Sequence, residues 1–199
     1  MENSDLKIQL VDSNKEMCDA WNLAFKDCSN ITIFNGDFFA LPTDCVVSPA
    51  NSFGFMNGGL DLAISDTLGW DVQGKLQQII KEKYFGELLV GQAELIETSN
   101  KNIPYCISAP TMRVPLTLSN SVNVYLAAKA IFQLLQSNPQ IKTVTISGLG
   151  TGVGMVPFDI CANQMKKAYD DIWLGLIEFP NTLYQAKQEH CKLFSHTFL

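Results

Sequence analysis

The residues from Ser147 to Pro157, SGLGTGVGMVP, contain four glycines within seven positions. This spacing suits a loop that binds a ligand through its backbone N–H groups. Glycine costs conformational entropy on folding, but its missing Cβ lets a ligand approach the backbone closely. The stretch follows the apolar run Val144–Ile146 and precedes a helical pattern. The N–H groups at such a strand-to-helix turn can bind a phosphate through their dipoles, without cations. Taken alone, the glycines are explained equally well by a tight turn that lets the helix pack closely on the sheet.

A second glycine-rich stretch, Ser48–Ser65, also runs from an apolar strand into a helical pattern. Two such loops can enclose one ligand. Within this stretch, Asn51 offers a donor and an acceptor that suit a sugar hydroxyl, and Asp61 lies in the first turn of the helix. Asp37, just after the strand Ile31–Phe34, could accept a hydrogen bond from an exocyclic amine. Simpler explanations exist, because a carboxylate stabilises a helix N-terminus and an aspartate after a strand can cap a turn.

Other kinds of site are disfavoured by the residues that the chain lacks. A P-loop needs G-K-[ST] at its end, and a dinucleotide fingerprint would need glycine at Val153 or Met155. The two histidines, His190 and His196, both lie in the last ten residues, which argues against a Ser-His-Asp or Cys-His site in the body of the domain. His, Cys and carboxylate residues do not cluster at metal-ligand spacing, so we expect neither a metal nor a cofactor.

Composition bounds the class of protein and its partners. The 199 residues, 47% hydrophobic and 17% charged, predict one globular domain. A net charge of −6 with a single arginine, Arg113, disfavours nucleic acid as the main partner, since such binding depends on neutralising phosphates. We find no signal-peptide pattern and no apolar run of membrane-spanning length, so we expect a cytoplasmic protein without a membrane partner. The six cysteines form no C-x-x-C pair and are expected to be reduced.

Short apolar runs alternate with segments of helical period, which predicts an α/β fold. The expected strands are Ile8–Val11, Ile31–Phe34, Cys45–Val47, Leu88–Ile96, Ile103–Ser108 and Val144–Ser147. The expected helices are Lys15–Lys26, Gly59–Thr67, Val72–Lys83, Ser121–Gln136 and Asp159–Ile172. Two consecutive strands without an intervening helix imply an antiparallel pair, and hence a mixed sheet covered by helices on both faces. The tail beyond Ile172 is expected to add one more helix.

Several motifs, in this order, resemble those of the macro domain family. They are G-D-F, V-V-S-P-A-N-S, N-G-G-L-D-L-A-I, G-Q-A, Y-C-I-S-A-P and G-L-G-T-G-V-G-M-V-P, and they extend from about Ile31 to Ile172. The resemblance implies a three-layer α/β/α fold with a central mixed β-sheet. It also implies a single macro domain over residues 1–199, with a core at about 31–172, an N-terminal strand and helix, and a C-terminal extension.

Macro domains bind ADP-ribose, and the resemblance assigns roles to the matching positions. Asp37 would accept from the adenine N6 amine with the Phe38 N–H nearby, and Asn51 would contact the distal ribose. The two loops would hold the diphosphate and the distal ribose. The matching loop positions are Gly58, Gly59, Leu60, Gly148, Leu149, Gly150, Thr151, Gly152, Val153, Gly154 and Met155.

The resemblance also suggests catalysis. In hydrolytic macro domains of the MacroD type, an asparagine and an aspartate ten positions later flank the scissile carbon of the distal ribose, and Asn51 and Asp61 reproduce that spacing. Asp61 would position or deprotonate water while Asn51 fixes the sugar, releasing ADP-ribose from a mono-ADP-ribosyl protein or from O-acyl-ADP-ribose. The partner would then be ADP-ribose or an ADP-ribosylated protein.

Two alternatives to hydrolysis remain open. Many relatives carry an aromatic residue in the second loop where this chain has Gly154-Met155, which favours a reader that binds ADP-ribose without turning it over. An interaction module that binds another nucleotide is the third possibility. Nearby apolar residues such as Phe55 and Met56 are expected to pack in the core or the loop, and Arg113 is expected to pair with a surface carboxylate.

Overall fold

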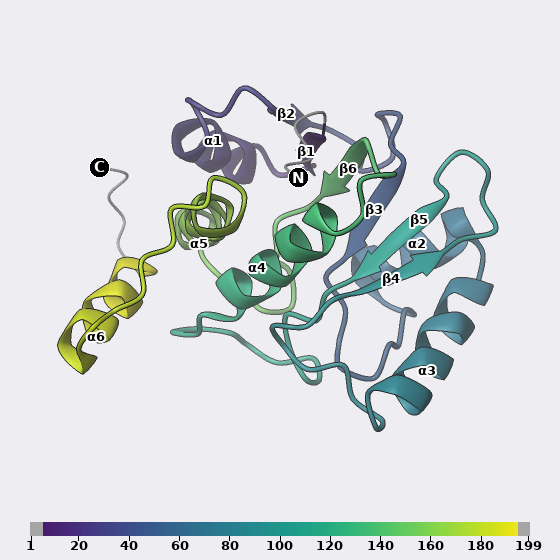
Figure 1. The fold of residues 1–199 in the computed structure, drawn as a ribbon. Helices are drawn as coiled ribbons and strands as arrows, with labels where there is room; N and C mark the ends of the chain where they lie inside the picture. Colours follow the sequence, from purple (N-terminus) through teal and green to yellow (C-terminus); the bar gives the residue numbers. More distant parts are fainter. Residues whose placement is uncertain (1–5, 195–199) are drawn as a thin grey trace.

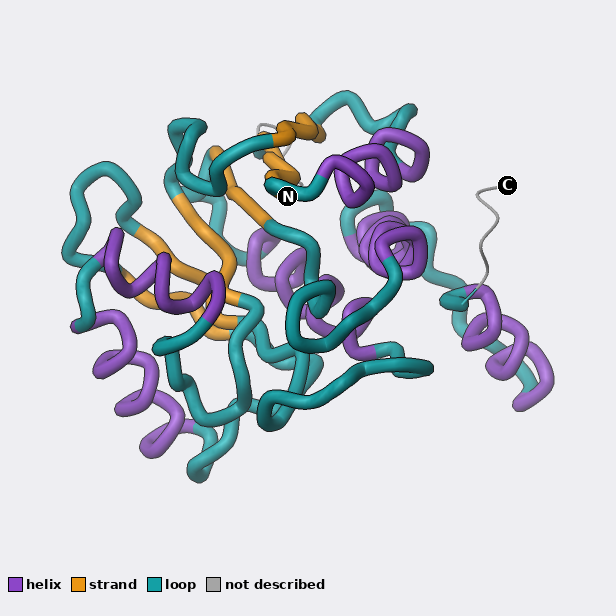
Figure 2. Tube along the Cα trace, turned by 180° about the vertical axis from the view of Figure 1, so that it is seen from behind, coloured by secondary structure: helices purple, strands orange, loops and turns teal. Residues whose placement is uncertain are grey.

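The computed structural model describes residues 6–194, so His196 and both ends of the chain lie outside the described residues. One six-stranded sheet runs through the molecule, with helices on both of its faces (Figures 1 and 2). The strands are β1 (Lys7–Asp12), β2 (Ile31–Asn35), β3 (Cys45–Ser48), β4 (Glu94–Glu97), β5 (Tyr105–Ser108) and β6 (Thr143–Ile146). The helices are α1 (Lys15–Ala24), α2 (Gly59–Leu68), α3 (Asp71–Lys83), α4 (Asn123–Gln136), α5 (Phe158–Ile172) and α6 (Leu183–Lys192).

The strand order is β2-β1-β6-β3-β5-β4, and every neighbouring pair is parallel except β4 with β5. The predicted mixed sheet and antiparallel pair are therefore confirmed. Parallel pairing has a consequence for function, because it brings the carboxyl ends of β1, β2, β3 and β6 to the same edge of the sheet. The loops that leave these four strands can meet there.

Two apolar clusters form the core, one on each face of the sheet. Adjacent residues of β3 show the alternation: Cys45 and Val47 belong to one cluster and Val46 to the other. The first cluster also takes in α1, α4 and α5, and the second takes in α2 and α3. Since both faces of β3 are covered, all four of its residues are buried.

The long predicted strand Leu88–Ile96 is wrong over most of its length, because only Glu94–Glu97 forms β4. Leu88 is fully buried, but it contributes to the core from a loop, with its N–H donated to the Ser52 carbonyl at 2.9 Å. Gly91 then turns the chain with a φ of 92°, a conformation that favours glycine. An apolar run identifies a buried segment, but it does not require that segment to be a strand.

The additional helix expected after Ile172 is present as α6, and a capping box formed by Thr182 and Gln185 starts it. It lies at the end of the molecule opposite α3 (Figures 1 and 2). None of its residues is buried. Polar contacts connect it to α5 instead, including a hydrogen bond from Asn163 Nδ2 to the Lys192 carbonyl at 2.8 Å.

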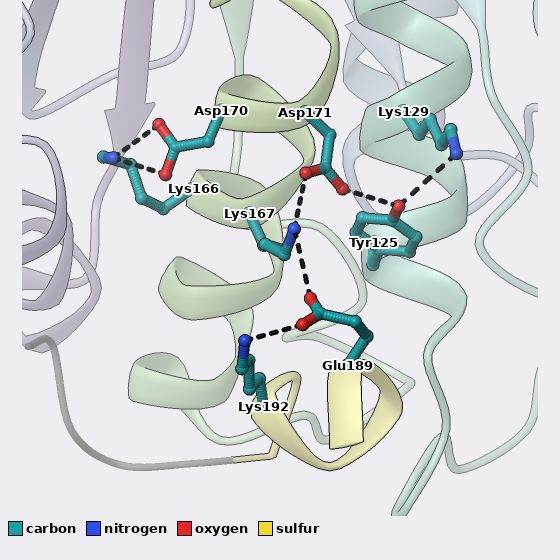
Figure 3. A network of polar contacts seen from close by, with 8 residues as sticks. All are labelled: Tyr125, Lys129, Lys166, Lys167, Asp170, Asp171, Glu189 and Lys192. Carbon is teal, nitrogen blue, oxygen red and sulfur yellow. Dashed lines mark hydrogen bonds and ion pairs between the residues drawn. The ribbon is translucent and has the colours of Figure 1, made fainter. Parts of the chain in front are cut away.

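A polar network ties α4, α5 and α6 together around one buried carboxylate (Figure 3). Asp171 accepts hydrogen bonds from Lys167 Nζ and from the Tyr125 hydroxyl, the latter at 2.8 Å, and its side chain is only 3% exposed. Lys167 also lies 3.6 Å from Glu189 of α6. Burial and the bond to Asp171 raise the pKa of Tyr125, so its hydroxyl stays a donor. Asp171 thus links α4 to α5 directly, and it holds the Lys167 side chain that also reaches Glu189 of α6.

We expect Asp171→Ala to lower the free energy of unfolding by about 2 to 3 kcal/mol, because it leaves the Lys167 charge and the Tyr125 hydroxyl without their shared acceptor. The matched control is Asp170→Ala, since Asp170 also pairs with the lysine four positions earlier but is 25% exposed. That change should cost less than about 1 kcal/mol. Urea unfolding of both variants measures the difference, and equal losses would contradict this account.

Candidate functional site

A cavity of about 650 Å³ lies at the carboxyl edge of the sheet. Its walls come from residues 11–13 at the end of β1, 36–39 after β2, 49–51 after β3, 57–61 at the start of α2, and the loop after β6. The volume is within the range of sites for a nucleotide-sized ligand. The strand order explains the position, because β3 and β6 are neighbours and their two glycine-rich loops face one cavity.

A few hydrogen bonds fix the conformation of the loop after β6, residues 147–155, which we call the glycine loop. Val156 N–H donates to the Gly150 carbonyl at 3.1 Å, and Gly148 N–H donates to Asp12 Oδ2 at 3.2 Å. In the described part of the chain, the N–H groups of residues 149–154 have no hydrogen-bond acceptor. A Cβ on Gly154 would lie 2.4 Å from the Gly150 carbonyl oxygen, and Gly150 has a φ of 70°. Both glycines are therefore needed for the loop to fold, and its N–H groups remain free to bind a ligand.

The first glycine loop ends at the N-terminus of α2. Gly58 is the N-cap and makes no side-chain capping bond, and Gly59 has a φ of 56°. The N–H groups of residues 57–61 have no acceptor among residues 6–194. Gly58, Gly59 and Leu60 all line the cavity. A helix N-terminus carries a partial positive charge, so this wall also suits an anion.

The charged side chains around the cavity are all acidic. Asp12, Asp37 and Asp61 line it, and no lysine, arginine or histidine of the described chain does so. Arg113 pairs with Glu87 through Nε at 2.8 Å and Nη2 at 2.6 Å, which confirms the expected surface pair. An anion in this cavity would be held by main-chain dipoles.

Asp61 lies in the first turn of α2 and accepts a hydrogen bond from Ser48 Oγ at 2.6 Å. Burial raises the pKa of its carboxyl from 3.8 to about 6, and the bond from Ser48 partly opposes that rise. Near neutral pH, Asp61 is therefore mostly ionised while remaining more basic than an ordinary aspartate. These are the properties of a group that can accept a proton from water.

Asn51 lines the same cavity, but its amide is engaged in its own loop. Nδ2 donates to the Phe55 carbonyl at 2.8 Å, and Oδ1 accepts from the N–H groups of Phe53 at 3.1 Å and Phe55 at 3.3 Å. The second hydrogen of Nδ2 remains available, since an amide nitrogen has two. Asn51 and Asp61 thus line the same cavity, and the Asn51 amide also stabilises the loop through its bonds to the backbone of Phe53 and Phe55.

Residues 36–39, which follow β2, form another wall of the cavity. Asp37 Oδ1 accepts from the Phe39 N–H at 2.8 Å, the turn-capping bond that the sequence offered as the simpler explanation. Asp37 and Phe38 nevertheless line the cavity, and the second carboxylate oxygen has no partner in the described residues. Phe38 packs edge-on against Phe39 with ring centres 5.1 Å apart. The carboxylate can therefore cap its turn and still accept from a ligand.

Not every predicted site residue lies along the cavity. Leu149 is fully buried in the core, and Met155 is 70% exposed with a φ of 53°; neither side chain lines the cavity. Thr151 and Val153 do line it, as do the loop glycines 148, 150, 152 and 154. The expectation for Phe55 is wrong, because its ring lines the cavity and is 54% exposed, whereas Met56 is fully buried as expected.

The structure also brings forward residues that sequence reasoning missed. Asp12 is the last residue of β1, much as Asp37 comes soon after β2. Its carboxylate accepts hydrogen bonds from the N–H of Gly148 in the glycine loop and from the N–H of Asn14, the N-cap of α1. Ser48, fully buried, holds Asp61. Asp12 could have been identified from the sequence, because it is an aspartate at the carboxyl end of an expected strand. Nothing in the sequence marked Ser48, because its role depends on a contact thirteen residues away.

Among residues 6–194, no group of three or more His, Cys, Asp and Glu side chains is placed to hold a metal ion. All six cysteines are free thiols, and burial raises the pKa values of Cys45 and Cys106. The described helices include none long and apolar enough to cross a membrane.

Comparison with known proteins places this geometry in context. A family model described as "Macro domain" matches residues 47–165. An uncharacterized protein of Aquifex aeolicus is 31% identical over 136 residues, which cover 68% of this chain and 78% of that protein.

Solved structures share the fold. A variant of the Oceanobacillus iheyensis macrodomain, solved with ADPR, superposes with a TM-score of 0.63 at 15% identity and covers 96% of this chain and 95% of its own. The macrodomain of Mycobacterium tuberculosis DarG gives a TM-score of 0.61 at 18% identity, over 70% of this chain and 90% of that one. The motifs, the family model and the three-layer α/β/α architecture agree, and the chain belongs to the macro domain family.

Proposed function

We propose that the protein binds ADP-ribose in the cavity at the carboxyl edge of the sheet. The observation that carries this proposal is that the N–H groups of residues 150–154 and 57–61 have no acceptor in the described chain, and that these residues line one cavity to which no described cationic side chain contributes. A diphosphate suits such a site, because fixed amide dipoles stabilise its charge and need no counterion. The Oceanobacillus iheyensis macrodomain solved with ADPR supports the choice of ligand.

In the proposed pose, each part of ADP-ribose lies against a different segment that lines the cavity. The adenine lies toward Asp37, whose free oxygen accepts from the N6 amine, with the Phe38 N–H nearby. The diphosphate lies between the glycine loop and the N-terminus of α2. The distal ribose reaches Asn51 and Asp61, which line the same cavity.

We further propose that the protein hydrolyses ADP-ribosyl conjugates at C1 of the distal ribose. Asp61 orients a water and takes its proton, the water oxygen forms a bond to C1, and the carboxylate of the conjugate leaves with the electron pair of the broken C1–O bond. The raised pKa of about 6 supports this role. The substrates would be mono-ADP-ribosyl protein or O-acyl-ADP-ribose.

A reader that binds without turnover is the second candidate, and two observations favour it. The Asn51 amide is largely committed to the backbone of its own loop. The glycine loop also has Gly154-Met155 where many relatives have an aromatic residue, and Met155 does not line the cavity. Less of the site is then left to fix the orientation of the ribose. Binding and turnover must therefore be measured separately.

The ligand is tested first by calorimetry with ADP-ribose and Asp37→Asn. The asparagine can still accept from the Phe39 N–H but turns a donor toward the adenine amine. We expect affinity for ADP-ribose to fall about tenfold, and the preference over inosine diphosphate ribose, which carries an oxygen in place of the amine, to shrink. No heat with ADP-ribose, together with heat from AMP or ADP, would indicate another nucleotide as the ligand.

Hydrolysis is tested with Asp61→Asn, which keeps an acceptor for Ser48 but removes the proton acceptor. We expect turnover to fall about 10² to 10⁴-fold while ADP-ribose affinity stays within about tenfold. The assay follows release of ADP-ribose from protein modified on Asp or Glu. Tight binding by the unmodified protein without any release would identify a reader, and release by the variant at the wild-type rate would remove Asp61 from the mechanism.

The pH dependence provides an independent test of Asp61. Because the ionised form acts as the base, activity should rise with pH through about 6 and then level off. Stability should show the opposite trend: the folded state binds this proton more tightly than the unfolded chain, so the Asp61 contribution falls as pH rises from about 4 to about 6. Comparing unfolding of wild type and Asp61→Asn across this range isolates the contribution, and parallel curves would contradict it.

A further inference from the structure

Two buried serines occupy matched positions beneath the first turn of α2. Ser48 ends β3 and Ser108 ends β5, and the two are paired directly in the parallel register of the sheet. Both are fully buried. Residues paired in this way point to the same face of the sheet.

That face is the one that α2 covers. Cys106, two residues before Ser108, packs in the same cluster as Ile64 of α2. Burial, and then the nearby Asp61 charge, raise the pKa of the Cys106 thiol, which places the carboxylate close to this part of the sheet. Both serine hydroxyls therefore lie on the Asp61 side.

The two hydroxyls differ in one respect. Ser48 Oγ donates to Asp61 Oδ1 at 2.6 Å, a short bond of the charge-assisted kind. Ser108 Oγ has no partner among the described residues, although it is just as buried. The pair is thus a natural comparison in which the residue type, burial and sheet position are shared and the bond to Asp61 is not.

We propose that Ser48 is a positioning residue for Asp61, fixing one carboxylate oxygen so that the other faces the ligand in the orientation that hydrolysis needs. This inference rests on the proposed function, in which Asp61 activates water. Ser48 is suited to the task because it belongs to the buried β3, whereas Asp61 lies in the first turn of a helix at the cavity wall. Oδ2 of Asp61 has no protein partner within residues 6–194.

The same hydrogen bond tunes the carboxylate. Burial favours the protonated form, and the Ser48 hydroxyl favours the ionised form, because a donor stabilises negative charge. Without that donor, burial would act unopposed and the pKa of Asp61 would rise above about 6. A residue that merely fills space under α2 would not have this effect.

The test compares Ser48→Ala with Ser108→Ala in the full chain. For Ser48→Ala we expect kcat to fall about tenfold or more while KM and the Kd for ADP-ribose change less than about threefold. The acid limb of the pH–rate profile should move to higher pH. Ser108→Ala should change each quantity less than about twofold, because it removes no hydrogen bond.

A second readout does not depend on turnover. The ionisation of Asp61 can be followed by NMR of its carboxyl carbon, which should titrate at higher pH in Ser48→Ala than in wild type or Ser108→Ala. If the wild-type protein releases no ADP-ribose, the proposed hydrolysis fails, and this titration still decides whether Ser48 holds Asp61. Ser48→Cys, close in size but a weak donor, takes the place of Ser48→Ala if that variant does not fold.

The proposal is overturned if both serine variants behave alike, or if Ser48→Ala lowers binding and turnover together while the Asp61 titration is unchanged. Either result would make Ser48 a packing residue.

Discussion

Everything in the proposed site depends on main-chain N–H groups that the fold leaves without partners. Every helix leaves its first N–H groups without intrahelical partners, and here the glycine loop adds a second set of such groups at the same cavity. The glycine loop can hold them because the close approach of Gly154 to Gly150 leaves no room for a side chain. Parallel pairing of β3 and β6 then places this loop opposite the N-terminus of α2. The sheet topology thus brings together the two loops of the proposed anion site.

Two opposing effects, burial and the hydrogen bond from Ser48, act on the pKa of Asp61. Burial at the cavity wall raises the pKa of its carboxyl to about 6, and the short bond from Ser48 opposes that rise. A fully exposed aspartate would be a weaker base, and a buried one without a donor would hold its proton more tightly. The contact between β3 and the first turn of α2 therefore bears on the proposed chemistry as well as on packing.

Much of this arrangement could be predicted from local sequence. Period and glycine position located five of the six helices and both loops, since these signals act over a few residues. What could not be predicted depends on distant contacts. Leu88 is apolar but fills the core from a loop, and Ser48 acquires its role from Asp61 on another element. Leu149 lies in the glycine loop, yet its side chain is fully buried in the core, where it packs with residues of α4 and α5.

The acidic character of the cavity limits which anions it can select. Asp12, Asp37 and Asp61 repel free phosphate, and no cation in the described chain lines the cavity to offset them. A ligand gains there only if its negative charge lies against the N–H groups while its own donors meet the carboxylates. A nucleotide sugar diphosphate meets both requirements, because its amine and hydroxyls lie at the two ends of the phosphates. In the proposed site, the carboxylates would therefore disfavour anions that bring no donors of their own, while the amide dipoles act only at short range on the phosphates.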